Sequence, residues 1–516
     1  MVSLLEHMAE IMSPLENGIK LMNPYNEEVE VRAYIFISPV DKPARCKVQN
    51  HKQFNGEYGC GICEQSGQML KEIDPEKYSA SRARVYPYNN DEPDGPLRTR
   101  ESIDDCVDKA RDAKKCVRGV FGPRPFSTLK HFDIVHGYVI ETMHGIYLGA
   151  LKRLYSLWFN SNLTAPWCLR PYIDEINNNI KENVYVPSGV SRTVRKIEYV
   201  HKWKANEIRI FFFCYFPILV KHLPNEYSEN YLSFIHAIFL LCTTNKTGDE
   251  VQKATILLNS FVENFEKLYW FEEMVSVIHD MLHLGLHVEM YNAIHSWSGF
   301  GFENLNGLLV ESVHGMKNPS TQIINSFVLF LKCLYIFNQD KDLTSIFREF
   351  GSKILLNKKK ESSAVCICKL FSCRLVKNRI LFDYFVSINV ANYYYCKKGW
   401  YKNSLIRSSL FANRIYEDSV LLLEQDSIIH CICIIRKDND EWSFFAHAFI
   451  EDQTKLNTVL NGYNNNQHPS VLSVGNFNGT ITEYPLSSFK ERLAVVDVEA
   501  ENILIIVRLP CFCEHN

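Results

Sequence analysis

Two pairs of potential metal ligands, one early in the chain and one beyond its midpoint, constrain the fold more than any other feature. The first is Cys60-Gly61-Ile62-Cys63 in a glycine-rich segment, and the second is His279-x3-His283 in an apolar segment with helical spacing. Two thiolates at this spacing, or two imidazoles one helical turn apart, can ligate one tetrahedral zinc ion. Two of each complete a four-ligand structural site.

Each pair also has a plainer interpretation. Cys60 and Cys63 are otherwise loop thiols without a role, and histidines within an apolar helix are often satisfied core residues. Gly59 and Gly61 suit a metal knuckle better than a redox C-x-x-C, which normally opens a helix after a strand. His287 continues the histidine stripe and is a substitute ligand.

The cysteine content and the N-terminus indicate a protein that is not secreted. The 17 cysteines are an odd number spread thinly over 516 residues, which is typical of reduced thiols in the cytosol or nucleus. Glu6, His7 and Glu10 interrupt the first apolar residues, and no positive charge precedes them, so we expect no signal peptide.

The longest apolar run, 210–220, does not predict a membrane segment. It is shorter than the roughly 20 residues that span a bilayer, and it contains Pro217. We expect a buried helix there.

Hydrophobic spacing divides the chain into a helical part and a β-rich end. Residues 3–20 have helical spacing and stop at Gly18. Residues 29–40 alternate and then become continuously apolar, which predicts a strand that ends at Asp41. Helical patterns dominate from 132 to 345.

The segments around this helical part are less regular. Residues 74–125 are expected to be loop with a charged helix near 103–117, and the segment 352–380 contains the basic run Lys358-Lys359-Lys360. In the last third we expect a strand, a turn across 438–440 and a second strand. Further strands are expected at 471–475, 493–498 and 502–509.

Three acidic residues are candidates for chemistry, each with a structural alternative. Asp41, before Lys42-Pro43, is a turn former or a ligand of a divalent metal ion. Glu303, between aromatic residues and Asn-x-Asn-Gly, is an acid at a helix N-terminus or a metal ligand. Glu141-x2-His144 opens a helix, where it acts as a cap or contacts metal or DNA.

The net charge of −3 excludes a globally basic nucleic-acid binder, but basic residues gather locally. Clusters of this kind contact phosphates, or they are solvated helix faces, and acidic residues interleave with the first cluster. The residues that we select as DNA contacts are Arg98, Arg100, Lys114, Lys115, Arg118, Arg195 and Lys196.

Five motifs in order resemble the transposases of CACTA-type (En/Spm-like) DNA transposons, within the RNase H-like DDE recombinase superfamily. They are Asp41-Lys42-Pro43-Ala44-Arg45, Asn55-Gly56-x2-Gly59-Cys60-x2-Cys63, Glu141-x2-His144-Gly145-x2-Leu148-Gly149, His279-x3-His283-Leu284 and Phe302-Glu303-Asn304-x-Asn306-Gly307. The resemblance covers roughly residues 1–345 and is weak beyond them.

The resemblance implies an α/β fold: a partial RNase H-like core, interrupted by a large zinc-tied α-helical insertion and followed by a small β-rich C-terminal domain. The ranges that it implies are 1–64 for the partial core with the knuckle, 65–290 for the insertion, 291–350 for the return to the core, 351–400 for a connecting segment and 401–516 for the β-rich domain.

The resemblance also implies a site in which Asp and Glu residues hold two Mg or Mn ions for DNA cleavage and strand transfer. Asp41 matches the second Asp of the family and Glu303 matches its final Glu. Cys60, Cys63, His279 and His283 match a structural zinc site. Glu141 stands where the family usually has Asp, so the roles of Glu141 and His144 are left open.

One departure from the family changes the expected function. Residues 1–40 contain no Asp, so the family's first catalytic acid is missing and the first strands of the core are not expected. We therefore expect an N-terminally truncated or domesticated transposase-derived protein that is catalytically inactive. The alternative is a zinc-stabilised DNA- or chromatin-binding, or protein-interaction, protein of the same origin. DNA is the expected partner, a homodimer follows from the resemblance alone, and the expected location is nuclear or cytoplasmic.

Overall fold

The computed structural model describes most of the helical part of the chain and most of the β-rich end. It describes residues 2–339 apart from 24–25, 75, 78–80, 82, 189, 191, 245 and 316, and residues 394–510 apart from 397, 402–403, 410–417, 437–441, 453–454, 456–470 and 499–502. The basic run at 358–360 and the turn at 438–440 lie outside the described residues.

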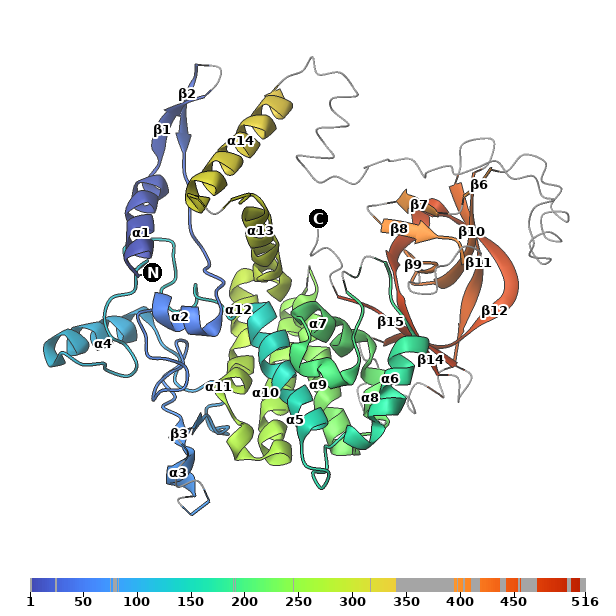
Figure 1. Cartoon of the computed structure of the whole chain (residues 1–516), viewed down its shortest axis with the longest axis horizontal. Helices are drawn as coiled ribbons and strands as arrows, with labels where there is room; N and C mark the ends of the chain where they lie inside the picture. Colours follow the sequence, from blue (N-terminus) through green and yellow to red (C-terminus); the bar gives the residue numbers. More distant parts are fainter. Residues whose placement is uncertain are drawn as a thin grey trace. The chain divides into compact units, whose positions relative to one another are not determined.

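The described chain forms two compact units. The first comprises Met1–Ile173, Ile197–Arg209 and His222–Gly299, and the second comprises Asp174–Lys196, Ile210–Lys221 and Phe300–Asn516. Helices prevail in the first unit, and the second contains an antiparallel sheet (Figure 1). The expected mixture of helices and a β-rich end is confirmed, while the finer ranges taken from the resemblance stay predictions.

The N-terminal part of the first unit consists of short elements joined by loops. Its helices are α1 (Val2–Asn17), α2 (Lys42–Val48), α3 (Leu70–Ile73) and α4 (Arg100–Ala113). Its strands are β1 (Ile19–Met22), β2 (Glu28–Val31), β3 (Gln68–Met69) and β4 (Arg84–Val85), which pair as two antiparallel hairpins. The helix expected at 3–20 is confirmed as α1, which ends before Gly18 at a φ of 96°.

The strand expected at 29–40 is wrong over most of its length. β2 ends at Val31, and the chain then runs without a ladder to Val40, which forms an isolated parallel bridge with Ile140. An apolar run becomes a strand only where a partner strand meets it, and here Ile35 and Val40 pack against a core of loop and helix side chains. The described strands of this unit form only two-stranded sheets, so the RNase H-like core is not confirmed.

Longer helices form the rest of the first unit. They are a π-helix (Met143–Leu151), α5 (Lys152–Asn160), α9 (Asn225–Cys242), α10 (Gly248–Tyr269), α11 (Ser276–His279) and α12 (Leu284–Tyr291), with short 3₁₀ turns at Arg170–Tyr172, Ile197–Lys202, Phe271–Glu273, Asp280–His283 and Ile294–Trp297. Helices α9 and α10 pack on each other, with the rings of Phe234 and Phe261 stacked at 4.1 Å. Figure 1 shows α5, α9, α10 and α11 gathered as one group.

The apolar run at 210–220 is buried, as expected. It lies in α7 (Ala205–Cys214), which runs from the first unit into the second, and in α8 (Phe216–Val220), which begins just before Pro217. Among the described helices, none combines the length and the apolar character that a membrane crossing needs.

The described residues of the second unit are built around a nine-stranded antiparallel sheet. Its strand order is β13-β9-β10-β11-β12-β15-β14-β5, and β6 also pairs with β10. The strands are β5 (Val184–Tyr185), β6 (Tyr394–Cys396), β9 (Val420–Leu423), β10 (Ile428–Arg436), β11 (Trp442–Glu451), β12 (Val471–Pro485), β13 (Phe489–Arg492), β14 (Ala494–Val498) and β15 (Ile503–Val507). The unit also contains the separate hairpin of β7 (Lys398–Tyr401) and β8 (Ser404–Arg407), a 3₁₀ turn at Leu486–Ser488, and the helices α6 (Ile173–Glu182), α13 (Phe300–Glu311) and α14 (Pro319–Gln339).

Both faces of this sheet are apolar. Leu421 and Leu423 contribute to one buried cluster, and Val420 and Leu422 contribute to another. Successive side chains of a strand point to opposite faces, which explains why this run is apolar without alternation. The paired strands expected on either side of 438–440 are confirmed by the pairing of Arg436 with Trp442.

Candidate metal centre

The two pairs of predicted ligands form one buried cluster in the first unit. The ligand atoms of Cys60, Cys63, His279 and His283 all lie within 4.8 Å of one another, and no side chain of the four is more than 4% exposed. Residues separated by 216 positions in the sequence meet here. Among the described residues, this is the group of three or more such ligands that is close enough to share a metal ion.

The distances in the cluster fit a tetrahedral zinc ion. Cys60 Sγ lies 3.6 Å from His283 Nε2, Cys63 Sγ lies 3.3 Å from His279 Nε2, and the two Nε2 atoms are 3.2 Å apart. Zinc bonds of about 2.3 Å to sulfur and about 2.05 Å to nitrogen require about 3.6 Å between sulfur and nitrogen and about 3.3 Å between two nitrogens. The four side chains can therefore hold zinc with little movement.

Neighbouring atoms pack closely against Gly59 and Gly61 of the cysteine loop. A Cβ atom on Gly61 would lie 2.2 Å from Oε1 of Gln49, and one on Gly59 would lie 2.6 Å from the carbonyl oxygen of Gln53. The ring of Tyr86 stacks on His279 at 5.0 Å, and its hydroxyl donates to the carbonyl of Gly56 at 3.1 Å. The aromatic ring thus joins the cysteine loop to the histidine helix.

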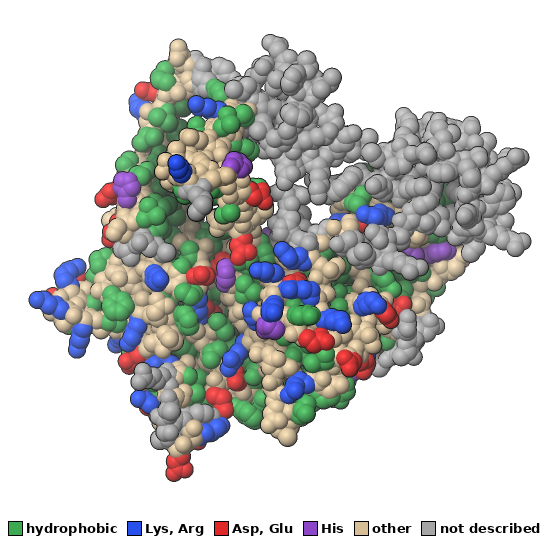
Figure 2. Space-filling view, in the orientation of Figure 1, with side chains coloured by type: hydrophobic (Ala, Val, Ile, Leu, Met, Phe, Trp, Pro, Cys, Tyr) green, Lys and Arg blue, Asp and Glu red, His purple; other side chains and the backbone are tan. Residues whose placement is uncertain are grey.

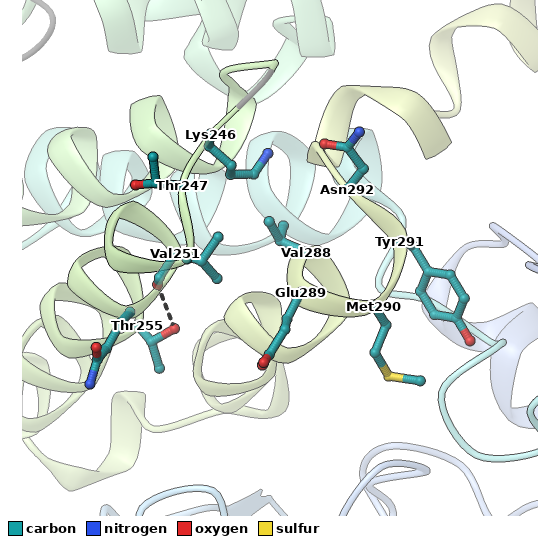
Figure 3. Close-up of a pocket in the computed structure, with 11 residues that line it drawn as sticks. Lys246, Thr247, Val251, Thr255, Val288, Glu289, Met290, Tyr291 and Asn292 are labelled. Carbon is teal, nitrogen blue, oxygen red and sulfur yellow. Dashed lines mark hydrogen bonds between the residues drawn. The ribbon is translucent and has the colours of Figure 1, made fainter.

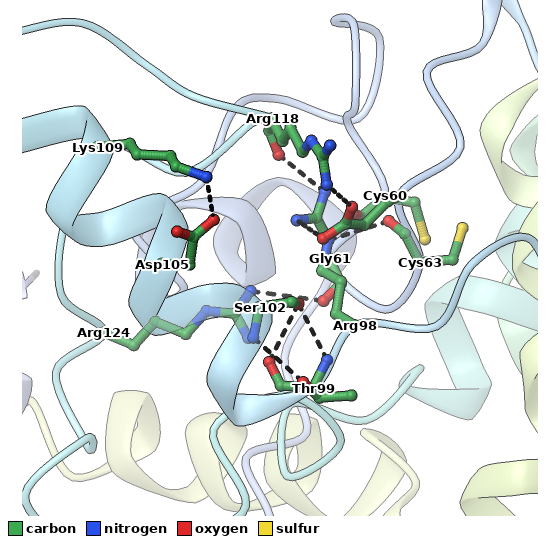
Figure 4. Close-up of polar contacts among 11 residues, drawn as sticks. Cys60, Gly61, Cys63, Arg98, Thr99, Ser102, Asp105, Lys109, Arg118 and Arg124 are labelled. Carbon is green, nitrogen blue, oxygen red and sulfur yellow. Dashed lines mark hydrogen bonds and ion pairs between the residues drawn. The ribbon is translucent and has the colours of Figure 1, made fainter. Parts of the chain in front are cut away.

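Two buried arginines donate hydrogen bonds to carbonyls of the cysteine loop (Figure 4). Arg98 Nε donates to the carbonyls of Cys60 at 3.2 Å and Cys63 at 3.0 Å, and Arg124 Nη2 donates to the carbonyl of Gly61 at 3.5 Å. Both side chains are about 1% exposed. Burial, aided by the charge of Arg98, lowers the pKa of Arg124 to about 9.

These contacts correct the role expected for Arg98. Its guanidinium positions the two cysteines through their carbonyls and is not exposed for the surface contact with DNA that the charge pattern suggested. A cluster in the sequence reports charge but not burial, so a buried arginine and a surface arginine give the same signal.

A buried ion-pair network joins the histidine segment to α2. Asp280, between the two histidine ligands, accepts from Arg45 Nη2 at 2.8 Å and pairs with Lys42 Nζ at 2.9 Å. Although burial alone would raise it, Arg45 and Lys42 hold the pKa of Asp280 below its ordinary value. Lys42 Nζ also donates to the carbonyl of Ser276 at 2.5 Å.

Asp41 lies at the N-terminus of α2, the helix that carries Lys42 and Arg45. Asp41 is the N-cap of α2, and its Oδ1 accepts a hydrogen bond from Ala44 N at 2.7 Å. Pro43, at the start of the helix, lacks the N–H that would be unpaired there. The expected strand end is therefore a helix start, and the sequence offered the signal in Asp-x-Pro. The sequence gives no signal for the pairing of Lys42 and Arg45 with Asp280, because Arg45 and Asp280 are 235 positions apart.

Glu141 is a buried cap, which was one of its two expected roles. Its Oε1 accepts from Met143 N at 2.7 Å and also from Gly299 N, and its Oε2 accepts from His144 N at 2.9 Å. His144 Nδ1 lies 2.6 Å from Oε2. Hydrogen bonds at both oxygens hold the pKa of Glu141 below its ordinary value, against the opposing effect of burial. The contact with Gly299 fixes the chain shortly before Glu303.

The other candidate residues are placed as follows. Glu303 is an exposed acid in the first turn of α13 and belongs to the second unit, whereas Asp41 belongs to the first. His287 is fully buried and its Nδ1 accepts from Ile140 N at 3.3 Å, so it occupies the core and not the cluster.

The remaining basic residues lie at the surface. Lys114 and Lys115 are exposed after α4, Arg118 pairs with Glu64 at 2.6 Å, and Arg195 and Lys196 are exposed in the second unit. On α4 itself, Lys109 pairs with Asp105 at 2.6 Å. Figure 2 shows Lys and Arg mixed with Asp and Glu over the visible face.

A hollow of about 900 Å³ lies between the start of α10 and the end of α12 (Figure 3). Its lining contains one cation, Lys246, which donates to the carbonyls of Thr243 at 2.8 Å and Leu241 at 3.4 Å, and one acid, Glu289. These side chains give the hollow no preferred ligand charge.

No family model and no curated protein matches the chain.

Proposed function

We propose that this protein binds DNA, and that a zinc ion on Cys60, Cys63, His279 and His283 stabilises the helical scaffold inherited from a CACTA-type transposase. The cluster supports the zinc part of the proposal, and the exposed cations Lys114, Lys115, Arg195 and Lys196 support the DNA part. The resemblance names four residues from two distant segments as one zinc site, and these four lie within 4.8 Å of one another.

The role of zinc in this proposal is structural. Four protein ligands fill a tetrahedral shell, whereas catalytic zinc sites keep a position open for water or substrate. The ligands are buried, and Arg98 and Asp280 hold the two halves of the site by their own contacts. The bound ion would hold the cysteine loop at 60–63 and the histidine segment at 279–283 together, and it would thereby fix the start of α2.

Binding, and not cleavage, is the activity that we propose. The family's two-metal chemistry uses three carboxylates, and the motifs identify two of them in this chain, Asp41 and Glu303. Asp41 already uses one oxygen to cap α2. DNA binding requires only cationic side chains at the surface, and it would place the protein in the nucleus.

The proposal is tested by fluorescence anisotropy with a labelled DNA duplex over a series of salt concentrations. We expect binding that weakens steeply as salt rises, because each phosphate contact releases a counterion. The absence of binding at low salt would refute DNA as the partner.

Supercoiled plasmid with Mn²⁺ tests the second part of the proposal. We expect no nicking. Nicking that disappears in both Asp41→Ala and Glu303→Ala variants would show that the chain is an active nuclease, contrary to the proposal.

A further inference from the structure

A pocket of about 450 Å³ in the first unit gathers more basic than acidic side chains. It lies between the start of α4 and the segment 130–136. Its charged lining consists of Arg98, Arg100 and Lys130 against Asp133, and two histidines, His131 and His136, complete the polar set.

The exposed cations at this pocket are bound to neutral groups. Lys130 Nζ donates to the amide oxygen of Asn17 at 2.8 Å, and Arg100 Nη1 reaches the carbonyl of Ser127 at 3.5 Å. In the described part of the chain, neither forms an ion pair with a carboxylate. Neutral acceptors leave the full positive charge of both side chains available to an anion.

The carboxylates of Asp133 and Glu16, near the pocket, already accept hydrogen bonds from backbone amides. Asp133 Oδ1 accepts from the amides of Val135 at 2.7 Å and His136 at 2.8 Å. The buried carboxylate of Glu16 accepts from Lys130 N at 2.8 Å and from His131 N at 3.3 Å. Hydrogen bonds from backbone amides offset part of each negative charge, so these acids weaken the positive field of the pocket without cancelling it.

Buried cations beneath the pocket add to its positive electrostatic potential. Arg124 donates to the carbonyl of Ile134, which belongs to the pocket wall. Arg98 also lies in the interior, but it contributes less because its Nη1 lies 3.8 Å from Glu64 Oε1. Charges in a low-dielectric interior are poorly screened, and their field emerges at the nearest opening. Thr99, the N-cap of α4, also lines the pocket, so the positive end of the helix dipole lies there, opposed by Glu101 in the first turn.

We propose that this pocket binds a phosphate group, with Arg100 and Lys130 as its direct contacts, and that the DNA backbone supplies this phosphate. The second clause rests on the proposed function. The side chains of Arg100 and Lys130 line the same pocket from two segments of the chain, and its volume of about 450 Å³ can admit a tetrahedral anion. Free phosphate has the same chemistry and is separated from DNA by the test.

The test compares Arg100→Gln/Lys130→Gln with a control of equal charge change, Lys71→Gln/Lys253→Gln. All four side chains are exposed, so neither variant is expected to disturb folding. Anisotropy with a labelled duplex gives the slope of log affinity against log salt. We expect the slope of the pocket variant to be smaller by about 0.9, the value for one phosphate contact, and that of the control to be unchanged. Inorganic phosphate, titrated calorimetrically, gives a second readout for the same proteins.

The outcomes separate the two proposals. DNA binding of the wild-type protein with equal slopes for both variants would overturn the pocket and leave the proposed function standing. If the wild-type protein bound inorganic phosphate but not DNA, and the pocket variant lost that binding, the anion site would be supported with free phosphate as its source, and the proposed function would be wrong. Binding of neither ligand to the wild-type protein would overturn both.

Discussion

Replacing Asp280 with asparagine removes the carboxylate that neutralises two cations of α2, Lys42 and Arg45. The carboxylate is 2% exposed, and the two cations are 13% and 4% exposed. Removing one partner of a buried ion pair leaves an uncompensated charge, which costs about 3–5 kcal/mol. That is a large fraction of the roughly 5–15 kcal/mol that stabilises an ordinary domain. We expect Asp280→Asn to loosen α2 and the histidine segment together.

Hydrogen–deuterium exchange of the full chain measures this effect locally. Peptides that cover 42–48 and 276–291 should exchange faster by a factor of about 100 or more, which corresponds to about 3 kcal/mol. Asp105→Asn is the matched control, because Asp105 forms an exposed pair with Lys109 that is worth less than about 1 kcal/mol. Exchange that is no faster in Asp280→Asn than in Asp105→Asn would refute the reasoning.

The dependence on pH gives a second check of the same prediction. Because the pKa of Asp280 is lowered in the folded state, its contribution is fully present above the unfolded pKa of about 3.9 and is lost as pH falls through the lower folded pKa. The difference between wild type and Asp280→Asn should therefore persist from about pH 5 to 8. A difference that vanishes within this range would contradict an ionised, paired carboxylate.

Three further perturbations test the surroundings of the cluster. Arg98→Gln should cost about 1.5–3 kcal/mol and speed the transfer of zinc to a colorimetric chelator, because the charged donor to the knuckle carbonyls is lost. Gly59→Ala should lower thermal stability by about 1–3 kcal/mol through overpacking, because its Cβ would meet the backbone carbonyl of Gln53, whereas Gly248→Ala, where a Cβ meets open space, should leave the melting temperature unchanged or raise it. Glu141→Gln should cost about 1–3 kcal/mol in urea unfolding above about pH 4.5, where the wild-type carboxylate is ionised and accepts from Gly299, and equal stability of both proteins at pH 7 would contradict the capping role.

The four residues of the candidate metal centre were predictable because the signal is local. A C-x2-C in a glycine turn and an H-x3-H at one helical turn each specify the geometry of half a site, and two halves make one tetrahedron. The network that supports them was not predictable. Arg45 and Asp280 are far apart in the sequence, and no spacing rule connects them before the fold is known.

The errors in the strand predictions have a related cause. Residues 29–40 have the composition of a strand, but a strand exists only where another strand pairs with it, and beyond Val31 no ladder forms. In the opposite direction, Val184 and Tyr185 join the edge of the C-terminal sheet, although two residues give no recognisable pattern. Long-range pairing decides both cases, and propensity records only local preference.

Metal analysis of the purified full-length protein tests the central claim most directly. The measurement compares wild type with Cys60→Ser/Cys63→Ser, in which hydroxyls replace both thiolates of the cluster while the other cysteines remain. The account predicts about one zinc ion per chain in the wild type, as expected for a four-ligand structural site, and a loss of that ion in the variant. Equal zinc contents in the two proteins would contradict it.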